Sequence, residues 1–223
     1  MPAPLDGKHS IPKTIEEIAA GYLADIRKVQ AKGPYFLAGY SWGGRLAFEI
    51  SQQLTAQGER VAFLGLIDTM FDFTREIAGE TKEARVQRHV QALKRQAIGP
   101  YLMRRIRKTA AHYVTQTGVM TRFLPNYLRM RFGPPIPYTR RLDVYSYVYS
   151  SATWRYTLHP YSGPITMFAA IGREEYQRAR WSRVAKGQLT VHEMPGAHFD
   201  MVEPPHSTVL AAKFDECLER IGA

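Results

Sequence analysis

The chain has 223 residues, 45% of them apolar and 22% charged, with a formal net charge of +10. This length can bury a core, and the apolar fraction excludes a disordered chain. Its apolar runs fall far short of the roughly 18 residues of a membrane span, and no apolar signal-peptide stretch is visible at its start. Cys217, the single cysteine, excludes an intramolecular disulfide and a cysteine metal cluster. We expect a soluble, cytoplasmic protein.

The positive charge is concentrated in one segment. Residues 72–141 contain 15 Lys or Arg and 4 Asp or Glu, whereas the rest of the chain contains 15 and 16. A localised excess of this kind indicates a binding surface more strongly than a diffuse one does.

The first part of the chain alternates between helical and strand patterns. The expected elements are a helix at Thr14–Gln30, a strand at Tyr35–Gly39, a helix at Arg45–Gln57 and a strand at Val61–Ile67. The first helix has apolar residues at helical spacing and a capping box, Thr14 and Glu17. Both strands are short apolar runs, which are typical of a buried parallel sheet. Strand, helix and strand with short connections predict a parallel βαβ unit.

Residues 70–150 interrupt this alternation with a basic, aromatic and mostly helical segment. The α/β pattern then resumes with a strand at Pro164–Ile171, a helix at Glu174–Val184, a strand at Leu189–Met194 and a helix at Ser207–Ile221. We therefore predict a single α/β domain with a mostly parallel sheet flanked by helices. Its core is residues 10–70 and 155–223, and residues 70–150 form a helical lid inserted over the strand ends.

Gly39-Tyr40-Ser41-Trp42-Gly43 matches the G-x-S-x-G pattern of a nucleophile elbow. The predicted strand before it and helix after it are the context that this motif requires. Ser41 would be the nucleophile, and the Trp42 N–H at the helix start would stabilise an oxyanion. The alternative is an ordinary glycine-rich turn with a helix-capping serine.

A serine nucleophile needs a histidine base, and the base needs an orienting acid. His198 follows the last predicted strand in Met194-Pro195-Gly196-Ala197-His198, at the strand end where catalytic groups gather, and His206 is the fallback. Asp68 ends the strand next to the nucleophile and is the favoured acid, although an Asp there can also cap a turn. Glu174 and Glu175, after the following strand, are its rivals.

Four stretches resemble the thioesterase domains that end nonribosomal peptide and polyketide synthases, a branch of the α/β-hydrolases. They are LDGKHSIPKTIEEIAAGYLADIRKVQ, GPYFLAGYSWGGRLAFEISQQL, HPYSGPITMFAA and LTVHEMPGAHFDMVEPP. The family places its acid where Asp68 stands and its histidine in a P-G-x-H loop that matches His198. The resemblance therefore favours Asp68 over Glu174.

Members of that family usually carry about fifty more residues at the start, with an early strand and an H-G-x-G-G type loop that supplies a second oxyanion N–H. This sequence begins after that region, so we expect an N-terminally short sheet. We also expect one oxyanion donor fewer, a loss that typically costs on the order of 10²–10³ in turnover.

The resemblance implies an acyl or peptidyl thioester substrate on the phosphopantetheine arm of a carrier protein, with no metal or cofactor bound by this chain. Carrier proteins are generally acidic, so Arg104, Arg105 and Arg107 of the basic segment are candidates to contact the partner, and Tyr40 the substrate. Solvated helix faces are the alternative. No nucleic-acid motif accompanies the basic residues. Two other functions stay open: an esterase or lipase acting on oxygen esters, and an impaired fragment that only binds carrier protein.

Overall fold

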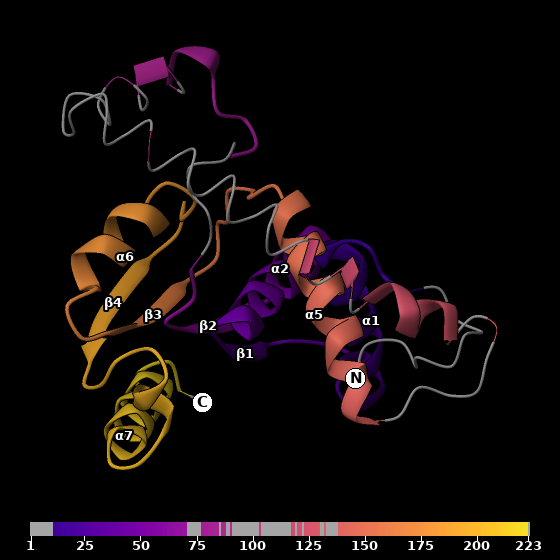
Figure 1. Ribbon diagram of the computed structural model, residues 1–223. Helices are drawn as coiled ribbons and strands as arrows, with labels where there is room; N and C mark the ends of the chain where they lie inside the picture. Colours follow the sequence, from indigo (N-terminus) through magenta and orange to yellow (C-terminus); the bar gives the residue numbers. More distant parts are fainter. Residues whose placement is uncertain are drawn as a thin grey trace. The chain divides into compact units, whose positions relative to one another are not determined.

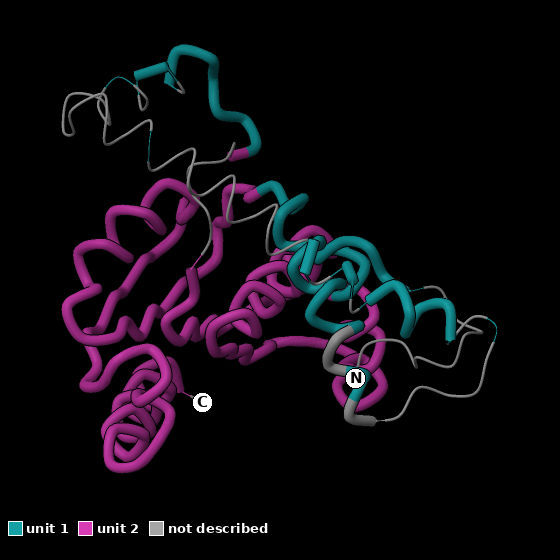
Figure 2. The backbone as a smooth tube through the Cα atoms, viewed as in Figure 1, with its two compact units in different colours: residues 1–18, 78–157 teal, residues 19–77, 158–223 magenta. Residues whose placement is uncertain are grey.

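A computed structural model describes residues 11–70, 77–84, 86–87, 90, 103, 117–118, 120–121, 123–129, 132 and 138–222. The chain divides into two compact units (Figure 2). One comprises residues 1–18 and 78–157, and the other comprises residues 19–77 and 158–223. The prediction of a single domain with a lid at 70–150 stays a prediction, since much of that segment lies outside the described residues.

The second unit is built on a parallel sheet whose four described strands run side by side in chain order (Figure 1). These strands are β1 (Tyr35–Tyr40), β2 (Val61–Ile67), β3 (Ile165–Ala170) and β4 (Leu189–Met194). The register pairs Gly39 with Leu66, Ile67 with Phe168, and Ala170 with Met194. The predicted α/β architecture with a parallel sheet is therefore confirmed. All four carboxyl ends lie at one edge of this sheet, because the strands are parallel.

Helices α2 (Trp42–Ala56) and α6 (Glu174–Trp181) cover one face of the sheet, α2 packing on β1 and β2 and α6 on β3 and β4. The two helices are in contact, because the Phe48 ring of α2 meets the Trp181 ring of α6 edge-on at 5.3 Å between centroids. The Trp181 indole also donates a hydrogen bond to the Thr69 carbonyl (3.2 Å), which satisfies its buried N–H. This contact ties the end of α6 to the chain that leaves β2.

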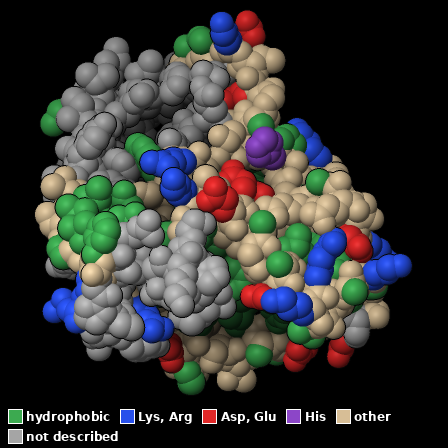
Figure 3. Space-filling model, turned by 90° about the vertical axis from the view of Figure 1, so that its right-hand side faces the viewer, with side chains coloured by type: hydrophobic (Ala, Val, Ile, Leu, Met, Phe, Trp, Pro, Cys, Tyr) green, Lys and Arg blue, Asp and Glu red, His purple; other side chains and the backbone are tan. Residues whose placement is uncertain are grey.

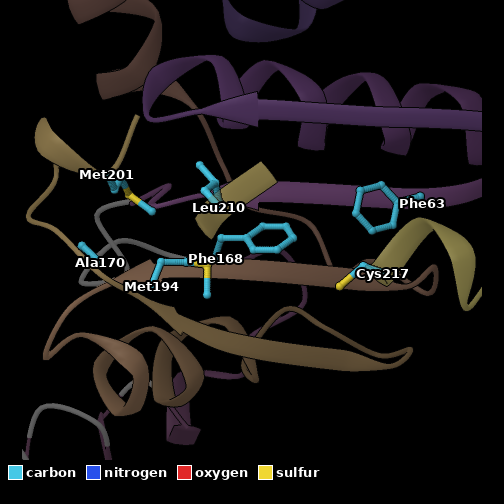
Figure 4. Close-up of a cluster of buried hydrophobic side chains, with 7 residues drawn as sticks. All are labelled: Phe63, Phe168, Ala170, Met194, Met201, Leu210 and Cys217. Atoms are coloured by element: carbon cyan, nitrogen blue, oxygen red, sulfur yellow. The ribbon is translucent and has the colours of Figure 1, made fainter. Parts of the chain in front are cut away.

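Helix α7 (His206–Glu219) and the short 3-10 helix η1 (Asp200–Val202) cover the opposite face. Figure 4 shows the apolar cluster that fills this layer. Its buried members are Phe63, Phe168, Ala170, Met194, Met201, Leu210 and Cys217. Phe214 of α7 stacks on Phe168 and meets Phe63 edge-on, so one helical side chain joins two strands. The single cysteine, Cys217, is part of this core.

The described part of the first unit contains α5 (Tyr138–Arg155) and an aromatic cluster. Phe123 stacks on Tyr147 of α5 at 4.0 Å and on Tyr127 at 5.4 Å between centroids. Helix α1 (Ile15–Val29) begins in this unit and ends in the other. The Glu17 N–H donates to Thr14 Oγ1 (3.1 Å), which is the predicted capping-box contact.

The element boundaries differ from the prediction at α2, which begins at Trp42 rather than at Arg45. The turn between β1 and α2 is Ser41 alone, so the two glycines that suggested a longer turn lie inside the helix. Ile77 and Leu158 form an isolated parallel β-bridge. These two residues flank residues 78–157, so the bridge lies where the chain leaves and rejoins the second unit. No helix among the described residues has the length and hydropathy needed to cross a membrane.

Candidate active site

The residues predicted to act together follow three strands at one edge of the sheet. Ser41 comes directly after β1, Asp68 directly after β2, and His198 lies in the loop after β4. In open α/β sheets, ligands bind at this carboxyl edge. The sheet topology therefore brings together side chains that are up to 157 residues apart in the sequence.

Ser41 occupies a backbone conformation that side chains rarely adopt, with φ 53° and ψ −115°. Its N–H donates to the Ile67 carbonyl (2.8 Å), which fixes the turn to the end of β2. Gly39 is required by the close approach of the helix, since a Cβ there would lie 2.4 Å from the Gly43 backbone. Among the described residues, the non-glycine positions with positive φ are Ser41 and Asp68. Strained backbone of this kind is found mainly at functional sites, and it persists only where the surrounding packing holds it in place.

Ser41, His198 and Asp68 form a continuous chain of polar contacts. Ser41 Oγ lies 3.0 Å from His198 Nε2, and His198 Nδ1 lies 2.7 Å from Asp68 Oδ2. The Asp68 side chain is fully buried, and the His198 side chain is 19% exposed. An ionised carboxylate only accepts hydrogen bonds, so the His198 proton lies on Nδ1 and leaves the Nε2 lone pair facing the Ser41 hydroxyl. A base in this tautomer is able to take the hydroxyl proton.

The Asp68 carboxylate receives three further hydrogen bonds that the sequence did not reveal. The Ala170 N–H (3.3 Å) and the Gln177 amide (3.2 Å) donate to Oδ1, and the Arg173 guanidinium donates to Oδ2 (2.8 Å). The backbone at Asp68 has φ 38°, and its N–H donates to the Phe168 carbonyl (2.8 Å). These donors satisfy a carboxylate that has no access to water. Arg173 and Gln177 carry no motif, so only the placement of α6 identifies them.

Tyr40 supports the loop that carries His198. Its hydroxyl donates to the His198 carbonyl (2.6 Å), and its ring stacks on the imidazole at 5.1 Å between centroids. Burial, aided by the negative charges of Asp68 and Asp200, raises the pKa of the Tyr40 phenol, so the hydroxyl stays a neutral donor. The Phe199 ring meets the imidazole edge-on at 4.9 Å, and Phe199 is 78% exposed. A role of Tyr40 in contacting substrate stays a prediction.

The alternative residues do not take part in the chain of contacts from Ser41 to Asp68. His206 begins α7 with its ring beside Gly196, Glu174 pairs with Arg178 (2.7 Å), and Glu175 is exposed. Trp42 is the first residue of α2, so its N–H lies at the positive end of the helix dipole, next to Ser41 in the chain. In the described part of the chain, no group of three or more His, Cys, Asp or Glu side chains is placed to hold a metal ion.

Arg104, Arg105 and Arg107 lie outside the described residues, so their predicted contact with a partner stays a prediction. On the face drawn in Figure 3, the Lys and Arg side chains of the described residues are interspersed with Asp and Glu.

A family model described as "Thioesterase domain" matches residues 1–218 of this chain. The chain belongs to this family. The match agrees with the nucleophile elbow and with the resemblance noted in the sequence, and it gives the chain a thioesterase role.

Curated relatives of this thioesterase domain are synthases and synthetases. Microperfuranone synthase of Emericella nidulans is 27% identical over 221 residues, which are 94% of this chain and 23% of that protein. Atromentin synthetase invA2 of Paxillus involutus is 47% identical over 60 residues, 27% of this chain and 6% of its own length. The inactive atromentin synthetase invA3 of the same organism is 46% identical over 63 residues, 28% of this chain and 7% of its own length. The chain thus spans a quarter or less of these relatives.

Solved thioesterase domains share the fold. The NocB thioesterase domain, in covalent complex with a fluorophosphonate nocardicin G analogue, aligns with a TM-score of 0.59 at 23% identity. That alignment covers 95% of this chain and 78% of the NocB chain. RedJ, with a polyethylene glycol molecule in its active site, aligns with a TM-score of 0.55 at 19% identity, covering 93% of this chain and 74% of RedJ. The mostly parallel sheet flanked by helices is therefore the α/β-hydrolase fold of thioesterase domains.

Proposed function

We propose that this thioesterase domain is a serine hydrolase in which Ser41 is the nucleophile, His198 the general base and Asp68 the residue that orients the base. The observation that carries the proposal is the continuous contact from Ser41 Oγ through the His198 ring to the buried Asp68 carboxylate. The strained φ of Ser41 supports it, because this conformation places the hydroxyl beside the imidazole at the sheet edge.

Acylation begins when Ser41 Oγ attacks the thioester carbon while His198 Nε2 takes the hydroxyl proton. The new C–O bond forms a tetrahedral intermediate, whose oxyanion the Trp42 N–H stabilises at the start of α2. The C–S bond then breaks, and the imidazolium returns the proton to the leaving thiolate. Asp68 stabilises the imidazolium through the Nδ1 hydrogen bond during these steps. An acyl-serine and a free thiol remain.

The second half-reaction releases the acyl group from Ser41. His198 removes a proton from water, or from an amine or hydroxyl of the acyl chain itself, and that group attacks the acyl-serine carbon. Water gives a carboxylic acid, and an internal nucleophile gives a ring. The imidazolium then returns the proton to Ser41 Oγ as the C–O bond breaks. The proposed roles of Ser41 and His198 are the same for both outcomes.

The substrate class that we propose is an acyl or peptidyl thioester on the phosphopantetheine arm of a carrier protein. Support comes from the relatives, which are synthases and synthetases many times longer than the matched segment. The arm belongs to the partner, so this chain itself needs no cofactor for the proposed steps. The basic excess of residues 72–141 suits an acidic partner.

The proposal is tested with a fluorophosphonate probe and intact-mass measurement of the purified protein. We expect one phosphonyl adduct on the parent protein and none on Ser41→Ala. The parent protein labelled at another residue, or not labelled while folded, would refute the Ser41 mechanism. The test is informative because similar stretches occur both in an atromentin synthetase and in a synthetase named as inactive.

A second measurement addresses the substrate. Turnover of a matched pair, an acyl thioester and the corresponding oxygen ester, distinguishes a thioesterase from a general esterase. We expect faster turnover of the thioester, and faster still when the same acyl group is attached to a carrier protein. Equal or preferred turnover of the oxygen ester would favour the esterase alternative. Carrier-protein binding that is unaffected by Ser41→Ala, with no turnover, would favour a binding function.

A further inference from the structure

Two hydrogen-bond donors compete for one oxygen of the buried Asp68 carboxylate. His198 Nδ1 lies 2.7 Å and Arg173 Nη1 lies 2.8 Å from Asp68 Oδ2. Arg173 is permanently charged, so Asp68 is shared between the imidazole and a guanidinium whose side chain is 37% exposed. A charge-assisted hydrogen bond of this length is among the stronger polar contacts in proteins. The proposed mechanism gives Arg173 no role.

Helix α6 presents Arg173 and Gln177 to the same carboxylate. Gly172, with φ +72°, turns the chain after β3, and Arg173 is the N-cap residue of α6. Gln177 lies four residues later and therefore on the same helix face. It is fully buried, and its amide donates to Asp68 Oδ1 (3.2 Å). Burying an amide is costly unless it is hydrogen-bonded, so this placement indicates a specific use.

We propose that Arg173 and Gln177 are positioning residues that hold the Asp68 carboxylate on His198, and that Arg173 also sets how strongly Asp68 favours the imidazolium. The inference rests on the proposed serine mechanism. Gln177 and the Ala170 N–H both donate to Oδ1, and together they fix the rotation of the carboxylate. Arg173 holds Oδ2 in place. Its positive charge also offsets part of the attraction between the Asp68 carboxylate and the His198 imidazolium.

The sign of the charge effect follows from the groups around His198. The titratable or charged side chains near this site in the described chain are Asp68, Arg173, Tyr40, Asp200 on η1 and His206 on α7. Of these, Arg173 is the permanent cation. Removing its charge leaves the Asp68 charge fully available to His198. The imidazolium then persists to higher pH, so the neutral imidazole that acts as the base forms only at higher pH.

The test measures the rate of fluorophosphonate labelling as a function of pH. In Arg173→Met we expect the midpoint of the acidic limb to move up by about half to one pH unit. The plateau rate should fall about 10-fold, because the carboxylate is held less firmly. Arg173→Lys, which keeps the charge, should restore the midpoint and part of the plateau.

Two further variants separate charge from position. Gln177→Met is close in volume and removes a neutral donor, so the plateau should fall while the midpoint stays that of the parent. Among the described residues Gln177 Oε1 has no hydrogen-bond partner, so the variant loses only the contact with Asp68. Arg178→Met removes an equal charge from α6 away from Asp68; the exposed Arg178 side chain pairs with Glu174 (2.7 Å) and donates to the Val191 carbonyl (3.3 Å). It should label like the parent protein.

A second readout keeps this inference separate from the proposed function. Nitrogen NMR of the His198 ring, assigned with His198→Gln, follows its titration in a folded protein whether or not Ser41 reacts. An unchanged His198 midpoint in a folded Arg173→Met protein would overturn the inference, even if Ser41 is labelled normally. Absence of labelling in the parent protein would instead overturn the proposed function, while the ring titration would still test the role of Arg173.

Discussion

Gly39→Ala should disrupt the turn that carries Ser41. A Cβ at this position would lie 2.4 Å from the Gly43 carbonyl carbon and oxygen and 2.5 Å from the Gly44 nitrogen, whereas ordinary contacts begin at 3.4 Å. The clash is with backbone at the start of α2, and no side-chain rotation relieves it. Strand β1 is also fixed, because Gly39 is in register with Leu66 of β2.

The required displacement of about 1 Å makes this a severe case of overpacking, which we expect to cost about 3 kcal/mol or more. For a chain of this size, that loss corresponds to a fall in Tm of about 6–12 °C. Scanning calorimetry measures the fall directly. Fluorophosphonate labelling of Gly39→Ala should also be lost at temperatures where the variant remains folded, because the start of α2, and Ser41 with it, must move away from β1.

Gly43→Ala is the matched control, because it adds the same methyl group four residues away in the same motif. A Cβ at Gly43 would meet nothing within 4 Å, and the residue lies inside α2. Its stability should be unchanged or raised by up to about 1 kcal/mol, as for glycine replaced in a helix. Equal Tm values for the two variants would refute the steric reasoning, as would a lower value for Gly43→Ala.

Three further predictions concern the core, the proposed acid and one partly buried histidine. Phe168→Ala should lower the free energy of unfolding by about 3–5 kcal/mol in urea titrations, because this ring lies fully buried between strands and α7; a loss below about 1 kcal/mol would contradict that packing. Asp68→Asn should slow fluorophosphonate labelling by about 10³–10⁴-fold with an unchanged circular dichroism spectrum, and near-normal labelling would rule out its role. Burial and the nearby positive charge of Lys213 lower the pKa of His192 in the folded chain below its ordinary value of 6.5. As the pH falls, the unfolded chain therefore binds this proton before the folded chain does, and the folded state loses stability below about pH 6.5. His192→Gln should reduce this loss of Tm between pH 7.5 and pH 5.5, roughly the range in which a histidine titrates, and an identical pH dependence would contradict the assignment.

The placement of Ser41, Asp68 and His198 could be predicted because each follows a recognisable strand. Short apolar runs indicated β1 and β2, the α/β pattern that resumes after residue 155 indicated β4, and parallel strands place their carboxyl ends at one edge. Local signals sufficed for this, because the glycines around Ser41 and the polar residue that ends β2 are visible in the sequence itself. The catalytic roles of these residues stay a proposal until Ser41 is labelled.

The partners of Asp68 on α6 could not be predicted, for a physical reason. Arg173 and Gln177 stand in a polar segment, Gly-Arg-Glu-Glu-Tyr-Gln-Arg, which favours a solvated helix start. Which side of such a helix turns inward depends on how Trp181 anchors its far end, and that is a tertiary contact. The predicted start of α2, Arg45, is three residues too late for a related reason. The low helix propensity of Gly43 and Gly44 predicts a turn, whereas close packing against β1 favours a helix there.

The β-bridge between Ile77 and Leu158 bears on how this chain tolerates change in length. It holds the two ends of an 80-residue excursion, residues 78–157, side by side within the second unit. The entropy lost in closing a flexible loop grows only with the logarithm of its length, so doubling or halving it changes stability by only about 0.6 kcal/mol. A change in the length of the excursion should therefore add little to the entropic cost of joining β2 to β3, as long as the Ile77–Leu158 bridge holds its two ends together. This junction is where we expect the chain to accept exchange of a whole segment while Ser41, Asp68 and His198 keep their scaffold.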